Sequence, residues 1–259
     1  MSLPFKVEMH TDIGIRKETN QDSMCVKEAQ TDKGNILFTV ICDGMGGLEK
    51  GEIASATIIN AFSTWFEKEL PYQLSKSNAY DDIRYCWERM IKEQNQNIAD
   101  YGRKNHIQLG STITAMLFFE NGKYLIGHVG DSRAYRITEN DIEMLTQDQT
   151  VVAREVKLGR LTPEEAERDP RRNVLLQCIG ASKIVEPDFA EGNYISGECY
   201  MLCSDGFRHV LSTEEIKETF APSRNTDEKG MKENIVRLIE LNKKREETDN
   251  ITAILIKVI

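Results

Sequence analysis

Short apolar runs, each too short to span a membrane, constrain the fold of this chain more than any other feature of its sequence. They have the length of buried strands. They cover residues 35–42, 112–119, 124–129, 200–203 and 251–258. Between the second and the third run stands Glu120-Asn121-Gly122-Lys123, whose Asn-Gly pair predicts a hairpin with a type I′ turn. Residues 134–137 and 143–145 predict two further strands, so we expect hairpin connections and antiparallel sheets.

Helical periodicity occupies the stretches between these runs. Apolar residues recur at helical spacing over 52–70, 80–102 and, in a shorter stretch, 232–242. Capping boxes starting at Thr162 and Ser212, each with Glu three residues later, mark the beginnings of two shorter helices. The chain is therefore expected to be α+β, with antiparallel sheets covered by helices.

Composition limits the organisation and the partners of the chain. With 259 residues and no linker rich in Gly, Ser or Pro, we expect a single domain over 1–259, in which residues 148–189 form the least regular insert. A formal charge of −9 disfavours nucleic acid as a partner. No run is long enough for a membrane span, the first ten residues lack the layout of a signal peptide, and the six cysteines form no CxxC pair. We expect a cytoplasmic protein with free thiols and no membrane partner.

Aspartates recur where the apolar runs begin or end. Asp43 follows the first run within Asp43-Gly44-Met45-Gly46-Gly47, Asp205 follows the run 200–203, and Asp249 precedes the last run. Asp131 follows the run 124–129, and Asp22 stands in Asn20-Gln21-Asp22. Only the tertiary fold could bring residues so far apart in the chain together at one edge.

Clustered carboxylates raise one another's pKa unless cations neutralise them. Oxygen ligands suit hard ions such as Mg²⁺ or Mn²⁺, so these aspartates indicate a binuclear metal centre. Taken singly, an Asp-Gly pair at a strand end is as well explained by a turn. Five such positions together weaken that explanation.

The chain resembles the metal-dependent serine/threonine protein phosphatases (PPM family, type 2C) in their bacterial single-domain form. The matching blocks follow one another in the family's order and cover nearly the whole chain. They are Gly14–Asp22, Val40–Ser55, Gly110–Thr112, Gly127–Tyr135, Leu145–Asp148, Arg172–Leu175, Leu202–Phe207 and Thr248–Thr252.

The resemblance implies a central antiparallel β-sandwich flanked by pairs of antiparallel helices, with two Mn²⁺ or Mg²⁺ ions at one end. Asp43 would bridge the ions while Gly44 offers its carbonyl, and Asp205 and Asp249 would complete one of the two sites. Asp22 would act through water. Asp131, together with Asp205, would form a weak third site, and the insert 148–189 would be a mobile flap.

In the family an arginine binds the substrate phosphate three residues before the Asn of the Asn-x-Asp block. Lys17 stands at that position here and Arg16 precedes it, so either could bind phosphate, with Arg16 slightly favoured for its bidentate fork. Met45 replaces a histidine that protonates the leaving group in eukaryotic relatives. His128 is expected to be a core residue. His209 either lies near the third ion or merely starts a turn.

These features favour a metal-dependent phosphatase that hydrolyses phosphoserine and phosphothreonine with a metal-activated water. Its partners would be phosphorylated proteins and a cognate Ser/Thr kinase with its targets, and we expect a monomer. One alternative is a catalytically weak or dead relative that binds phosphoproteins, although such relatives tend to lose metal-binding aspartates. Another is a two-metal nuclease, which the acidic charge and the lack of a basic groove disfavour.

Overall fold

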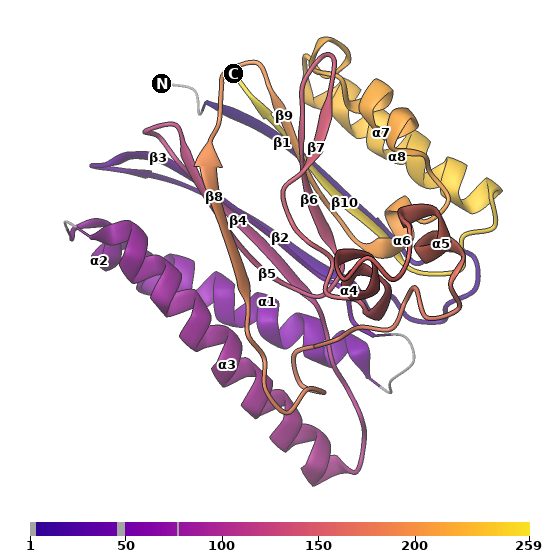
Figure 1. Ribbon diagram of the computed structural model, residues 1–259. Coiled ribbons are helices and arrows are strands. Elements are labelled where there is room, and N and C mark those ends of the chain that lie inside the picture. The colour runs from indigo at the N-terminus through magenta and orange to yellow at the C-terminus, as the bar shows by residue number, and fades with distance from the viewer. Residues whose placement is uncertain (1–3, 46–49, 77) are drawn as a thin grey trace.

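Two five-stranded antiparallel sheets face each other in the computed structural model, which describes residues 4–45, 50–76 and 78–259 (Figure 1). In spatial order, the first sheet holds β1 (Phe5–Asp12), β10 (Ile251–Val258), β9 (Cys199–Cys203), β6 (Arg133–Ile137) and β7 (Ile142–Met144). The second holds β2 (Ser23–Thr31), β3 (Gly34–Cys42), β4 (Ile113–Phe119), β5 (Lys123–Val129) and β8 (Asp188–Asn193). This sandwich confirms the expected α+β class.

Helices cover the outer face of each sheet (Figure 1). Against the second sheet lie α1 (Gly51–Lys68), α2 (Leu70–Leu74) and α3 (Ala79–Asn105). Against the first lie α7 (Thr213–Phe220) and α8 (Glu228–Lys244), joined by the 3₁₀ turn Pro222–Arg224. The described part of the chain also contains the short helices α4 (Val151–Lys157), α5 (Pro163–Arg168) and α6 (Asp205–Arg208). Within the described residues, no helix is long and apolar enough to cross a membrane.

The core consists of three apolar layers, and β3 shows how one strand serves two of them. Side chains alternate across a strand, so Phe38 and Val40 pack towards α1 and α3, while Leu37 and Ile41 pack between the sheets. Both faces of β3 are therefore apolar, which is why it reads as a continuous run in the sequence.

The strands that the sequence analysis did not predict lie at sheet edges. β1 and β2 are the edge strands on one side of the sandwich and β8 is an edge strand on the other, and all three are largely half-buried or exposed. Polar residues on the open side interrupt their apolar pattern, so no run marks them. β8 also includes the last two residues of the insert 148–189, which itself contains α4 and α5.

The two helix caps predicted from the sequence are present, but the predicted hairpin turn is of another type. Both capping boxes are present, with Thr162 and Ser212 each accepting a hydrogen bond from the backbone three residues later. The β4–β5 hairpin exists, but its turn is not type I′: Gly122 has a φ of 83°, whereas Asn121 is not left-handed. The loop has three residues and ends on a left-handed glycine, because Phe119 pairs directly with Lys123. Gly46 and Gly47 of the Asp-Gly motif lie outside the described residues.

Candidate metal centre

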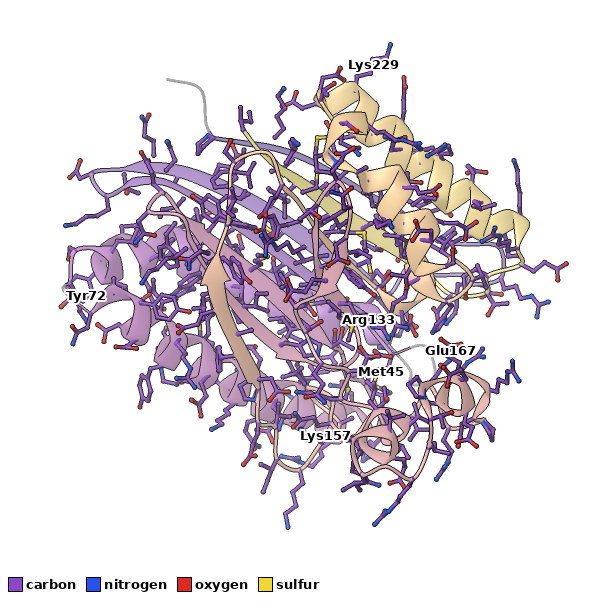
Figure 2. All side chains as sticks on the ribbon, turned by 45° about the horizontal axis from the view of Figure 1, so that its top comes forward. Met45, Tyr72, Arg133, Lys157, Glu167 and Lys229 are labelled. Atoms are coloured by element: carbon purple, nitrogen blue, oxygen red, sulfur yellow. The ribbon has the colours of Figure 1, made fainter. Side chains whose placement is uncertain are left out.

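The topology brings all five predicted aspartates to one end of the sandwich. In an antiparallel sheet the end of one strand lies beside the beginning of its neighbour. β2 begins opposite the end of β3, and β10 begins near the end of β9. Asp22 and Asp43 therefore adjoin one strand pair, Asp249 and Asp205 adjoin the other, and Asp131 follows the end of β5. Figure 2 labels Met45, just after β3, and Arg133, at the start of β6, at this end of the molecule.

Burial and mutual repulsion make these carboxyl groups reluctant to ionise. Burial and then the charges of Asp22, Asp205, Asp131 and Asp249 raise the pKa of Asp43 well above its usual value. Burial, with the charge of Asp205, raises the pKa of Asp22 and that of Asp131 to about 7. Since each carboxyl group senses the others, they form one electrostatic cluster.

Two buried oxygens of this cluster have no hydrogen-bond partner among the residues that the structure describes. Thr252 Oγ1 donates to Asp22 Oδ2 at 2.5 Å, but Asp22 Oδ1 has no partner, nor does Asp205 Oδ1. A buried carboxylate oxygen without a donor is costly, and a cation removes that cost. Oxygen donors on several acidic residues thus fit hard divalent ions.

The residues do not form a closed cage of side chains. Within the described ranges, no three Asp, Glu, His or Cys side chains converge closely enough to hold one ion by themselves. An open centre does not need such a cage, because Mg²⁺ keeps several water ligands and takes only one or two carboxylates.

Backbone hydrogen bonds hold Asp43 and Gly44 in place. Asp43 N–H donates to Thr112 Oγ1 at 2.9 Å, and the Asp43 carbonyl accepts from Thr112 N–H at 2.9 Å and from Ser111 Oγ at 3.0 Å. Gly44 N–H donates to the Gln21 carbonyl at 3.1 Å. A Cβ at Gly44 would lie 2.5 Å from that same carbonyl oxygen. The approach of the two backbones therefore requires glycine at this position.

Asn250 connects this centre to the loop that carries the candidate phosphate-binding cations. Its Nδ2 donates to the carbonyls of Ile13, at 3.0 Å, and Thr19, at 3.3 Å, and its Oδ1 accepts from Gln21 N–H at 2.9 Å. Asn250 was not among the residues predicted for the site. Nothing local marks this role, because the bonded loop lies some 230 residues away in the chain.

The two candidate cations differ in placement. Lys17 Nζ lies 2.8 Å from Asp249 Oδ1, whereas the Arg16 side chain is exposed. Burial by itself would lower the pKa of Lys17. The hydrogen bond to Asp249 and the charges of Asp249, Asp43 and Asp205 outweigh burial, so the pKa is raised above its usual value. The structure thus brings Lys17, rather than the slightly favoured Arg16, to the aspartates.

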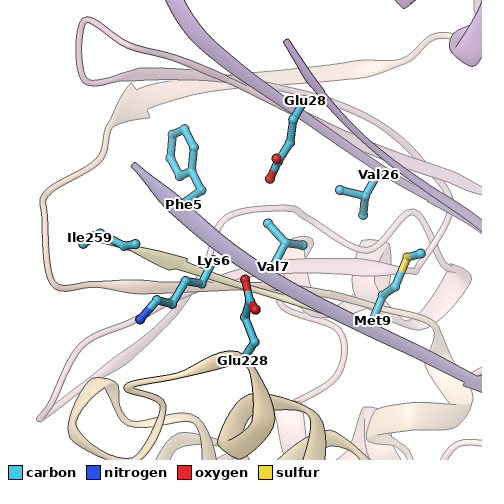
Figure 3. Close-up of a pocket in the computed structure, with 8 residues that line it drawn as sticks. All are labelled: Phe5, Lys6, Val7, Met9, Val26, Glu28, Glu228 and Ile259. Carbon is cyan, nitrogen blue, oxygen red and sulfur yellow. The ribbon is translucent and has the colours of Figure 1, made fainter. Parts of the chain in front are cut away.

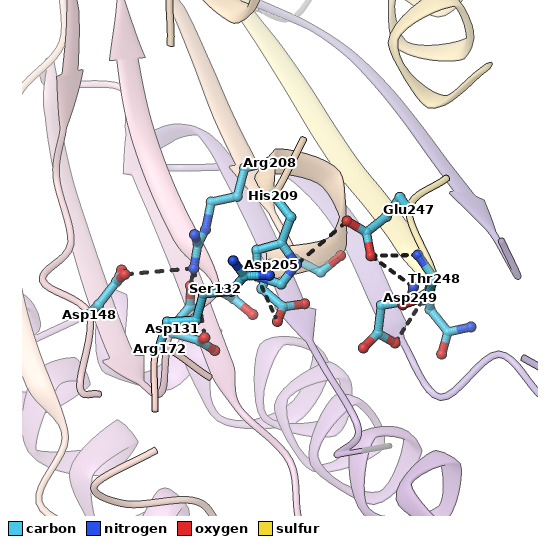
Figure 4. A network of polar contacts seen from close by, with 12 residues as sticks. Asp131, Ser132, Asp148, Arg172, Asp205, Arg208, His209, Glu247, Thr248 and Asp249 are labelled. Carbon is cyan, nitrogen blue, oxygen red and sulfur yellow. Dashed lines mark hydrogen bonds and ion pairs between the residues drawn. The ribbon is translucent and has the colours of Figure 1, made fainter. Parts of the chain in front are cut away.

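His209 stands between two carboxylates beside the centre (Figure 4). Its Nε2 lies 3.4 Å from Asp205 Oδ2 and its Nδ1 lies 3.6 Å from Glu247 Oε2. Glu247 Oε1 in turn accepts the N–H groups of Thr248, at 2.7 Å, and Asp249, at 2.9 Å. His209 therefore contacts the centre rather than only starting a turn.

Arg208 is a cation that the sequence analysis missed. Its Nη2 lies 3.7 Å from Asp131 Oδ2 and 3.6 Å from Asp148 Oδ2. No local pattern marks it, since Asp131 lies 77 residues earlier. His128, by contrast, is the expected core histidine: it is 1% exposed, and its Nδ1 lies 3.0 Å from Thr114 Oγ1.

A hollow of about 470 Å³ lies along the open edges of β1 and β2, near the beginning of α8 (Figure 3). None of the five aspartates lines it. Glu28 and Glu228 carry its negative charge, and exposed Met9 and Ile259 carry part of its apolar surface. The candidate metal centre therefore lies outside this hollow.

Comparisons with known proteins agree with this fold. The family model of protein phosphatase 2C matches residues 14–240. A protein phosphatase 2C-type protein of Streptococcus pyogenes serotype M6 is 32% identical over 254 residues, which are 97% of each chain. A bacterial serine phosphatase of known structure is 29% identical with a TM-score of 0.85 over 98% of both chains.

A second solved structure, the catalytic domain of the serine/threonine protein phosphatase PstP, holds two manganese ions. It is 27% identical to this chain, with a TM-score of 0.78 over 98% of both chains. The family match extends from the loop of Lys17 to α8 and so includes four of the five aspartates. This chain belongs to the protein phosphatase 2C family, the metal-dependent serine/threonine protein phosphatases.

Proposed function

We propose that this phosphatase acts at the aspartate end of the sandwich and that Asp43, Gly44, Asp205 and Asp249 hold two Mn²⁺ or Mg²⁺ ions there. The observation that carries the proposal is that Asp22 and Asp205, within one cluster of mutually repelling carboxylates, each have a buried oxygen with no hydrogen-bond partner among the described residues. When bound, two such ions supply Lewis acidity and a nucleophile at neutral pH for the hydrolysis of a phosphomonoester.

The protein's own groups would then bind and orient the substrate. The substrate phosphate is a dianion that approaches a chain of net charge −9, so a local cation has to attract it. Lys17 provides that cation next to Asp249, and Asn250 holds the loop that carries it. Met45 offers no titratable group, so the departing serine or threonine oxygen would take its proton from solvent.

The finer assignments rest on the family resemblance. Asp131 with Asp205 would form a weak third site, and Asp22 would act through water. Residues 148–189 would be the flap beside this end, since Gln149 N–H donates to the Gly130 carbonyl at 2.8 Å, next to Asp131. The substrates would include a cognate Ser/Thr kinase and its targets, bound by a monomer of one domain.

Hydrolysis of a phosphothreonine peptide with and without Mn²⁺ tests the proposal. We expect activity with Mn²⁺, none in excess EDTA, and a loss of at least about a thousandfold in Asp43→Asn, which removes a ligand charge without changing the volume. Asp32→Asn is the matched control, because Asp32 is exposed in the β2–β3 turn. Full wild-type activity in EDTA, or an active Asp43→Asn variant, would contradict the proposal.

A further inference from the structure

Arg208 places a permanent positive charge beside Asp131, which is expected to hold the third ion. It is the last residue of α6, three residues after Asp205. Only 13% of its side chain is exposed. Its Nη2 donates to the Asp131 carbonyl at 3.0 Å and lies 3.7 Å from the Asp131 carboxylate (Figure 4).

The neighbouring carboxylate of Asp148 lies 3.6 Å from Arg208 Nη2 and shares this charge, but it also has a partner of its own. Arg133 binds Asp148 through two hydrogen bonds, from Nε at 2.8 Å and from Nη2 at 2.7 Å. That is the bidentate geometry in which a guanidinium neutralises one carboxylate. Two arginines thus face the two carboxylates of Asp131 and Asp148, so Asp148 does not use up the charge of Arg208 by itself.

The charge of Arg208 is fixed as well as close. A guanidinium keeps its proton at every pH at which proteins stay folded. A divalent cation placed between Asp131 and Asp205 would meet Arg208 as a like charge in a partly desolvated site, where such repulsion is strong.

We propose that Arg208 takes the electrostatic place of a third metal ion, so that this phosphatase works with two ions and binds a third one weakly. The inference rests on the proposed function, since it concerns the same centre. Arg208 is a positioning residue in this proposal: it acts through Asp131 and does not touch the substrate.

Counting bound Mn²⁺ by isothermal titration and by electron paramagnetic resonance tests this inference without an activity readout. We expect two tight ions and a weak third in the wild type. Arg208→Gln should tighten the third site by about tenfold or more, because it removes the repelling charge. Arg208→Lys, which keeps the charge, should leave the third site weak. Adding Asp131→Asn to Arg208→Gln should abolish the gain.

The outcomes separate this inference from the proposed function. Fewer than two tight ions in the wild type would refute the two-ion centre itself. Two tight ions with a third site that Arg208→Gln leaves unchanged or weakens would refute the role of Arg208 alone. If Arg208→Gln fails to fold, a third ion that binds to the wild type as tightly as the first two still refutes the inference.

Discussion

Replacing Asp22 by asparagine should stabilise the protein when metal ions are removed, although the same change removes a group of the metal centre. Asp22 is 8% exposed and has a pKa of about 7, compared with its ordinary 3.8. That difference corresponds to about 4 kcal/mol of unfavourable ionisation in the folded state above pH 7. Neighbouring carboxylates share this cost, so we expect Asp22→Asn to raise the free energy of unfolding by about 1 to 3 kcal/mol. The asparagine carbonyl can still accept the hydrogen bond from Thr252.

The sign of the pH dependence follows from the raised pKa. Between the unfolded value of 3.8 and the folded value of about 7, the folded protein binds a proton that the unfolded chain releases. The ion-free wild type therefore loses stability as the pH rises through this window. The advantage of Asp22→Asn should be complete at pH 8, shrink between pH 7 and pH 4, and disappear below that range.

Urea unfolding followed by circular dichroism in EDTA, at pH 8 and at pH 5, measures this difference. The exposed Asp32→Asn change serves as the control and should shift the free energy of unfolding by less than about 0.5 kcal/mol. In saturating Mn²⁺ the wild type should be more stable than Asp22→Asn, because its complete centre binds the ions and bound ions stabilise only the folded state. A variant no more stable than the wild type at pH 8 in EDTA, or an equal gain at both pH values, would refute the reasoning.

Two further changes test the cations around the centre. Lys17→Ala should raise KM for a phosphothreonine peptide about tenfold, because it removes the charge beside Asp249, whereas Arg16→Ala on the same loop should have a small effect. Equal effects of both changes on KM would contradict the assignment of Lys17. His209→Asp places another carboxylate beside Asp205, so it should raise magnesium-supported activity more than manganese-supported activity. Activity that matches the wild type across titrations of both metals would count against a role for His209.

The sequence predicted the strands that are buried on both faces. Of the strands at sheet edges it predicted β7 but missed β1, β2 and β8. β3 and β4 lie between a helix layer and the opposite sheet, so nearly every position is apolar. β1 and β2 form open edges of the two sheets, and their half-buried and exposed positions make no pattern regular enough to be recognised. The type I′ turn was wrong for a related reason: Asn-Gly permits that turn, but the register of the flanking strands selected the three-residue loop.

The candidate site was predictable to the extent that its residues follow strand ends. The sequence marks Asp43, Asp205 and Asp131 by their place directly after apolar runs, and the antiparallel topology brings strand ends together. Arg208 and Asn250 carry no such mark, because their partners are chosen by how α6 and the β10 entry pack against distant loops. Contacts of this kind follow from the tertiary structure alone.

The basic side chains of this end divide the five aspartates into two groups. Three aspartates have a basic partner, and two have none within ion-pair distance among the residues that the structure describes. The three pairs are Lys17 with Asp249, Arg208 with Asp131, and His209 with Asp205. The aspartates without such a partner are Asp22 and Asp43, and the pKa of each is raised chiefly by burial.

This division separates the aspartates whose charge a basic side chain of the protein partly neutralises from those whose charge only metal ions can neutralise. A charged basic side chain lowers the cost of burying the aspartate beside it at every metal concentration. It also lowers the affinity of that aspartate for a metal ion. Asp22 and Asp43 keep the full cost until ions arrive, so ions bound by Asp43 and, through water, by Asp22 should yield the largest gain in stability. Substitutions of the basic residues should therefore change how many ions bind and how tightly, whereas substitutions of Asp43 should decide whether the centre forms.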